Sequence, residues 1–166
     1  MDVPTIDPAI LQAIHDTALG EAIRNSAYLF PTLETIHFIG LCLLIGAMVL
    51  VDLRLVGFLR GPIRPVLVFT RLAIAGFVIN LLSGIGFFTS NPANYAGNPL
   101  FWVKMGAVML AGLNVAWFEL AERRELLALP EGAKPPGRTR VVAAMSLALW
   151  ASVIVLGRYL PVLGVG

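Results

Sequence analysis

The chain has 166 residues, of which 58% are hydrophobic and 13% are charged. Soluble domains carry about 25% charged residues, and a small chain folded in water buries only part of its surface. The mean hydropathy of +0.84 and the long uncharged apolar runs therefore exclude a soluble enzyme, a disordered chain and a disulfide scaffold. They predict an integral membrane protein, whose surroundings are the lipid bilayer. The net charge is +2, and the basic residues flank the apolar runs, so we expect no nucleic-acid partner.

An amphipathic helix is predicted over residues 7–27, ahead of the first apolar run. Asp7 is a suitable N-cap, and Pro8 is favoured at the first helical position. Apolar residues then recur at near-helical spacing among polar ones, which is typical of a helix lying on a membrane surface. No basic region precedes an apolar stretch at the start of the chain, so we expect no cleavable signal peptide.

Four apolar segments are each long enough to span a bilayer, which takes about 20 helical residues. They cover about 32–59, 66–89, 100–120 and 141–163, and the third is expected to continue past the bilayer. Short segments rich in proline, glycine or asparagine connect them. The predicted fold is all-α, with residues 1–166 forming a single membrane domain built as a four-helix transmembrane bundle.

The distribution of Lys and Arg predicts the orientation, because these residues are enriched in cytoplasmic loops. The first and third connections are basic, the second has no Lys or Arg, and the N-terminal segment has only Arg24. We therefore expect both chain termini and the second connection on the outer side of the membrane. The other two connections are expected in the cytoplasm.

Ionisable residues inside membrane spans are energetically costly and are candidates for function. Near the cytoplasmic end, Asp52 and Arg71 are predicted at similar depth on the first two spans, and a salt bridge between them is expected to join the two helices. The alternative is that Arg71 extends to the cytoplasmic interface. Near the outer end every span carries a polar group. The candidate binding residues in this outer layer are Glu34, His37, Asn80, Lys104 and Arg158.

Helical phase, at about 100° per residue, indicates which way these groups face. Lys104 shares a face with Ala111, and Arg158 is in line with Ala151. Small residues mark close helix contacts in membranes, so both cations are predicted to face the bundle interior. The polar groups of the outer layer would then line an outward-facing pocket. The alternative is that both side chains extend to the outer lipid headgroups.

A histidine with two cations nearby suits a b-type haem. His37 is the candidate axial ligand, and Lys104 and Arg158 would pair with the propionates. His15 is the second histidine of the chain, so the candidate iron ligands are His37 and His15. A quinone is the alternative cofactor, with its headgroup hydrogen-bonded by His37, Asn80 and Arg158.

Other chemistry has less support. Copper is disfavoured because Met48 lies about three turns from His37 and Cys42 lies on another face. A proton path is disfavoured because the middle of the first span is apolar. The sequence has no phosphate-binding loop, nucleophile elbow, cysteine pair or zinc motif, so no catalytic residue is assigned.

The motifs that carry a family resemblance are Leu33-Glu34-Thr35-Ile36-His37, Asp52-Leu53-Arg54-Leu55, Asn98-Pro99-Leu100-Phe101-Trp102-Val103-Lys104 with Asn114, and Gly157-Arg158-Tyr159. The first motif continues through Phe38-Ile39-Gly40, Asn114 follows Leu113, and the last span adds Ser146-Leu147-Ala148-Leu149-Trp150. Together these motifs resemble an uncharacterised bacterial family of small four-span inner-membrane proteins. That family is loosely similar to the membrane domain of copper-resistance D proteins and to four-helix b-type cytochromes. The resemblance implies the bacterial inner (cytoplasmic) membrane, with a periplasm on the outer side, and singles out His37, Asp52, Arg54, Lys104, Asn114 and Arg158.

The leading hypothesis is a small inner-membrane protein that holds haem b in the outward-facing pocket. It would transfer electrons to a redox or membrane-protein partner rather than turn over a substrate. The alternative is a non-redox accessory subunit or a small-ligand carrier, including a quinone-binding protein, in which the polar layer is structural. Stripes of small residues on the last span leave a homo-oligomer open.

Overall fold

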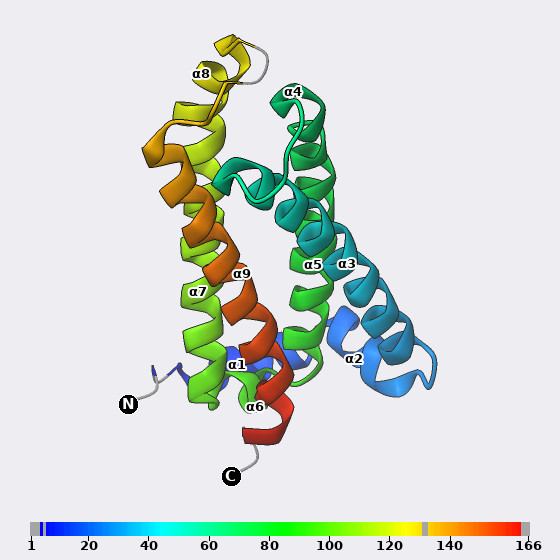
Figure 1. Ribbon diagram of the computed structural model, residues 1–166. Helices are drawn as coiled ribbons and strands as arrows, with labels where there is room; N and C mark the ends of the chain where they lie inside the picture. The colour runs from blue at the N-terminus through cyan, green and yellow to red at the C-terminus, as the bar shows by residue number, and fades with distance from the viewer. Residues whose placement is uncertain (1–3, 5, 131–132, 164–166) are drawn as a thin grey trace.

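A computed structural model describes residues 4, 6–130 and 133–163 of the chain. The predicted single domain also includes residues 1–3, 5, 131–132 and 164–166, which lie outside the described residues. The expectation of no signal peptide falls partly on residues 1–3 and 5. The elements in chain order are α1 (Pro8–His15), α2 (Ala18–Asn25), α3 (Leu29–Val56), α4 (Ile63–Val66), α5 (Phe69–Ser90), α6 (Pro92–Ala96), α7 (Pro99–Trp117), the π-helix η1 (Phe118–Glu122), α8 (Arg123–Ala128) and α9 (Gly137–Leu163) (Figure 1). The described residues contain no strand, so the all-α prediction is confirmed.

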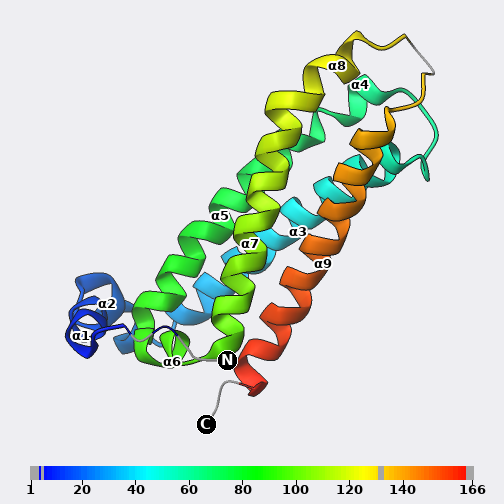
Figure 2. The same cartoon turned by 90° about the vertical axis from the view of Figure 1, so that its left-hand side faces the viewer.

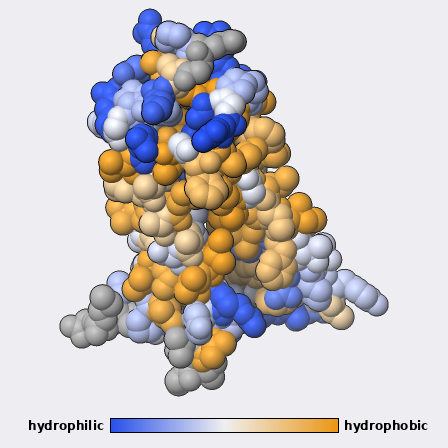
Figure 3. Space-filling model, in the orientation of Figure 1, coloured by the Kyte–Doolittle hydropathy of each residue, from blue (hydrophilic) through white to orange (hydrophobic). Residues whose placement is uncertain are grey.

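Four helical segments are long and apolar enough to cross a membrane: Leu29–Val56, Ile63–Ser90, Pro99–Ala128 and Gly137–Val162. On the face shown in Figure 3, apolar side chains form a broad band over the middle of the bundle, and polar side chains gather towards its two ends. The protein is therefore a multi-pass membrane protein with a four-helix bundle, as predicted. The third segment runs unbroken from α7 through η1 to α8, so its predicted continuation past residue 120 is confirmed.

The four long helices associate in two pairs, α3 with α5 and α7 with α9, and the pairs meet where α3 packs on α9 (Figures 1 and 2). No Cα atom of α5 lies within 8 Å of a Cα atom of α7. Side chains fill part of this wider space: the rings of Phe77 on α5 and Trp150 on α9 meet edge to face, with centroids 6.3 Å apart.

Two glycines allow α3 and α5 to cross closely. A Cβ atom on Gly76 would lie 2.5 Å from the backbone nitrogen of Leu44, and one on Gly40 would lie 2.6 Å from the side-chain amide nitrogen of Asn80. Only glycine leaves room for this approach, which is how small residues bring helices together in membranes. The crossing fixes the rotation of α5 and turns Ser83 towards α3, where Ser83 is buried.

The short helices divide between the ends of the bundle. The α6 end carries α1, α2 and α6, whereas the α8 end carries α4 and α8 (Figure 1). Asp7 caps α1 as predicted, because its carboxylate accepts a hydrogen bond from the backbone of Ala9 at 2.8 Å. The prediction of a single helix over 7–27 is wrong, because the first helix ends at His15 and a second begins at Ala18. The hydroxyl of Thr17 caps the second helix by accepting a hydrogen bond from the backbone N–H of Gly20 at 3.3 Å. A capping hydroxyl at this position offers the backbone an alternative to continued helix.

Candidate functional site

The first polar cluster in the bundle, the His37 cluster, comprises His37 on α3, Asn80 and Ser83 on α5, and Lys104 on α7. His37 and Ser83 are in direct contact, with Nδ1 of the imidazole 2.7 Å from the serine Oγ. The imidazole also stands edge-on to the ring of Phe87, at a centroid distance of 5.3 Å. The half-buried ring is thus held from two sides by α5.

The hydrogen bonds of Ser83 identify the protonated nitrogen of His37. The Ser83 hydroxyl lies 2.7 Å from the carbonyl oxygen of Ile79 and 3.3 Å from that of Asn80. Carbonyl oxygens only accept, so the single hydroxyl proton points to them and the serine oxygen accepts from His37. Nδ1 of His37 therefore carries a proton. Nε2 has no hydrogen-bond partner among the described residues and presents its lone pair.

Lys104 faces the bundle interior, as predicted. It is half-buried, and its Nζ lies 3.5 Å from the position that a Cβ of Gly157 on α9 would occupy. Its charge also acts on the His37 ring from across the bundle. Ala111, on the same face of α7, is completely buried, which agrees with the phase argument.

Asn80 completes the cluster from α5. Its side-chain amide donates to the carbonyl oxygen of Gly76 at 2.9 Å. The amide oxygen is buried and has no partner in the described part of the chain. The cluster thus holds two unused acceptors, Nε2 of His37 and Oδ1 of Asn80, and one ammonium group.

The predicted inward orientation of Arg158 is wrong. Arg158 and Ala151 are exposed, whereas Ser146, Trp150 and Val153 form the buried face of α9. Alanine is tolerated at a lipid-facing position as readily as at a helix contact, so the stripe of small residues did not identify the packed face. Arg158 is not part of the His37 cluster.

No hydrogen bond or ion pair in the described part of the chain links Glu34 or His15 to the cluster. Glu34 is exposed. The pKa of the Tyr95 hydroxyl on α6 is raised, mainly because Tyr95 is partly buried and secondly because of the negative charge of Glu34. The Nδ1 atom of His15 on α1 lies 2.9 Å from a carboxylate oxygen of its neighbour Asp16, and this hydrogen bond is the main reason that the pKa of Asp16 is lowered. The described residues contain no group of three or more His, Cys, Asp or Glu that could hold a metal ion.

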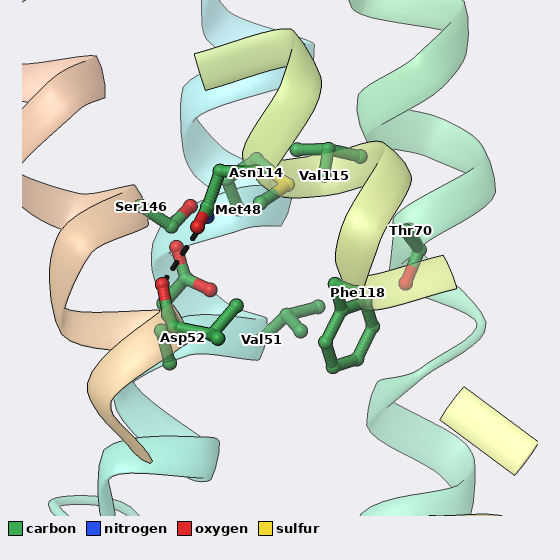
Figure 4. Close-up of a pocket in the computed structure, with 10 residues that line it drawn as sticks. Met48, Val51, Asp52, Thr70, Asn114, Val115, Phe118 and Ser146 are labelled. Atoms are coloured by element: carbon green, nitrogen blue, oxygen red, sulfur yellow. Dashed lines mark hydrogen bonds between the residues drawn. The ribbon is translucent and has the colours of Figure 1, made fainter. Parts of the chain in front are cut away.

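The second polar cluster, the Asp52 cluster, comprises Asp52 on α3, Asn114 on α7 and Ser146 on α9. The three side chains point towards one another beside a small cavity, with Thr70 and Phe118 across from them (Figure 4). Asp52 and Ser146 are buried, and Asn114 is partly buried. The predicted salt bridge between Asp52 and Arg71 is wrong, because Arg71 is exposed and the buried neighbour on α5 is Thr70, about 100° around the helix.

At the α8 end, Glu122 joins α9 to the π-helix. Its carboxylate accepts a hydrogen bond from the hydroxyl of Thr139, and Nε of Arg138 lies 3.1 Å from its other oxygen. Glu122 and Thr139 are both buried. This pair was not predicted from the sequence, because Glu122 is one of several glutamates among the basic residues of this region and nothing local distinguishes it.

Among known proteins, no family model, curated protein or solved structure matches this chain. The resemblance described above stays a prediction. Function is therefore inferred from the two clusters themselves.

Proposed function

We propose that the protein is a membrane-embedded binding protein for a redox cofactor, and that Nε2 of His37 is its contact with that cofactor. The supporting observation is the hydrogen bond between His37 and Ser83, which assigns the proton to Nδ1. Metal-bound histidines commonly donate their other ring N–H to a fixed acceptor, which sets the tautomer and the ring orientation.

Haem b is the first candidate cofactor. The donor set fits a haem with one protein ligand, because His37 offers a free Nε2 and Lys104 offers an ammonium group for a propionate. When bound, the haem would supply one-electron chemistry. The chain would hold its iron through His37, bind its carboxylate through Lys104, and keep water away with apolar side chains such as Phe87.

A quinone is the second candidate, and the unpartnered amide oxygen of Asn80 favours it. A quinol hydroxyl could donate to Asn80 or His37, and a quinone carbonyl could accept from Lys104. Both cofactors would use the α6 end of the bundle. The Lys and Arg distribution supports the outer side of the membrane for this end, and the family resemblance supports a bacterial inner membrane. A redox partner would then meet the protein on that side.

Replacing the two histidines one at a time tests the assignment. We expect His37→Ala, purified from haem-sufficient cells, to lose nearly all bound haem, because the iron loses its protein ligand. His15→Ala is the matched control and should keep its haem, since His15 already bonds Asp16. Haem content is measured as the pyridine haemochrome, and thermal unfolding checks that both variants fold.

The opposite pattern would exclude His37 as the ligand: full haem content in His37→Ala, with loss of haem in His15→Ala. Loss of haem in both variants would instead make both histidines ligands. If the wild-type protein carries a quinone and no haem, extraction and chromatography of its lipids identify the second candidate.

A further inference from the structure

Asp52 is a buried carboxylate without a charged partner. The residue is 3% exposed, and none of the ion pairs in the described part of the chain involves it. The nearest arginine in sequence, Arg54, donates from its Nε to the carbonyl oxygen of Gly61 at 2.7 Å. An unpaired charge inside a membrane span is very unfavourable, so Asp52 requires either a proton or a bound cation.

The groups around Asp52 are oxygen ligands that still lack partners. One carboxylate oxygen of Asp52 and the hydroxyl of Ser146 are buried and have no partner with full hydrogen-bond geometry among the described residues. Ser146 nevertheless lies close enough to the carboxyl group of Asp52 to interact with it. Asn114 donates its amide N–H to the carbonyl oxygen of Val142 at 3.2 Å, which leaves its amide oxygen free. The helices α3, α7 and α9 thus each contribute oxygen atoms, from Asp52, Asn114 and Ser146, beside the same cavity (Figure 4).

The adjoining cavity is small. Its volume of about 10 Å³ has room for roughly one water-sized particle, so it admits a bare monatomic ion and excludes an organic ligand. Carboxylate, amide and hydroxyl oxygens suit hard cations, and the cluster has no nitrogen or thiolate ligand for zinc or copper. A single carboxylate balances one positive charge.

We propose that Asp52, Asn114 and Ser146 form a binding site for one small monovalent metal cation of the size of Na⁺. The ion neutralises Asp52 and joins α3, α7 and α9 in this half of the bundle. The site shares no residue with the His37 cluster, so a failure of the sodium test would not bear on the proposed cofactor binding, and the reverse also holds.

Thermal unfolding of the detergent-purified full chain tests the site. We compare NaCl with choline chloride at equal ionic strength, since choline is too large for the cavity. We expect NaCl to raise the Tm of the wild type by about 5 °C, because a ligand that binds only the folded state stabilises it. The same rise is expected in Glu34→Gln, a control that removes an exposed carboxylate from the same helix.

In Asp52→Asn the sodium-dependent rise should vanish, while the variant should be at least as stable as the wild type in choline chloride, because the unpaired charge is gone. Equilibrium dialysis with ²²Na⁺ should give one bound ion for each wild-type chain and none for Asp52→Asn. Ser146→Ala should bind the ion several-fold more weakly. No bound ²²Na⁺ and equal Tm values in the two salts would overturn the proposal and leave Asp52 protonated.

Discussion

The chemistry of the His37 cluster depends on one serine hydroxyl. Ser83 bonds the carbonyl oxygen of Ile79 on its own helix and accepts from His37 on the neighbouring helix, with both distances 2.7 Å. These two hydrogen bonds orient the imidazole and leave Nε2 as the nitrogen without a proton. A serine that only packed against α3 would leave the tautomer of His37 undefined.

Ser83→Ala should therefore weaken cofactor binding without unfolding the protein. The loss of an outer partner of a metal-bound histidine typically lowers affinity about 10- to 100-fold, and we expect a loss in this range. The measurement is haem titration of the apoprotein, followed by absorbance. Ser152→Ala is the control, because Ser152 is exposed and its hydroxyl bonds only the carbonyl oxygen of Ala148. Equal affinities for the two variants would contradict the orienting role of Ser83.

At the scale of helices, the α3–α5 crossing determines which residues meet. Gly76 lies against the backbone of Leu44, and this contact turns Ser83 and Asn80 towards α3. The same rotation leaves Arg71 exposed. The His37 cluster and the missing Asp52–Arg71 salt bridge thus have one structural cause.

Gly76→Ala should lower thermal stability, because the added methyl would lie 2.5 Å from a backbone nitrogen that cannot move independently of its helix. Overpacking of this kind costs about 1–3 kcal/mol. Gly84→Ala is the matched control on the same helix, since a methyl group added there would have no neighbouring atom within 4 Å. Thermal unfolding in detergent should show a lower Tm for Gly76→Ala alone. Equal Tm values would contradict the close crossing.

The sequence predicted the elements better than the directions of individual side chains. Hydropathy and length located all four spans, and the phase of Lys104 with Ala111 predicted the packed face of α7. The same argument failed for Arg158, because alanine has little preference between lipid and a neighbouring helix. Depth alone paired Asp52 with Arg71, but whether they meet depends on helix rotation, which is set by the long-range contact at Gly76. Ser146 lies within the fourth predicted span, yet no local pattern marked it as a neighbour of Asp52.

At the scale of the whole molecule, the apolar band seen on one face lies between two different polar ends (Figure 3). The α8 end is basic and includes Arg64, which donates to the carbonyl oxygen of Leu127 at 2.8 Å, and Arg140, which donates to that of Val56 at 3.1 Å. The connection that contains α6 has no Lys or Arg. This asymmetry supports the proposed orientation, with the α8 end in the cytoplasm.

Thiol labelling of single-cysteine variants measures that orientation. Cys42 is first replaced by Ser, and one cysteine is then introduced by Asn94→Cys in α6 or by Lys134→Cys in the basic connection, both at exposed positions. A membrane-impermeant maleimide should label Asn94→Cys in intact bacterial cells, and Lys134→Cys only after permeabilisation. The reverse pattern would invert the proposed topology and place the His37 cluster near the cytoplasm.

The most direct test of the central claim is the absorption spectrum of the purified wild-type protein, recorded oxidised and then reduced with dithionite, together with its iron content. Because His37 offers a free Nε2 and Lys104 an ammonium group in the same half of the bundle, we expect a Soret band that shifts on reduction and about one iron per chain. A colourless, iron-free protein from haem-sufficient cells would contradict haem binding.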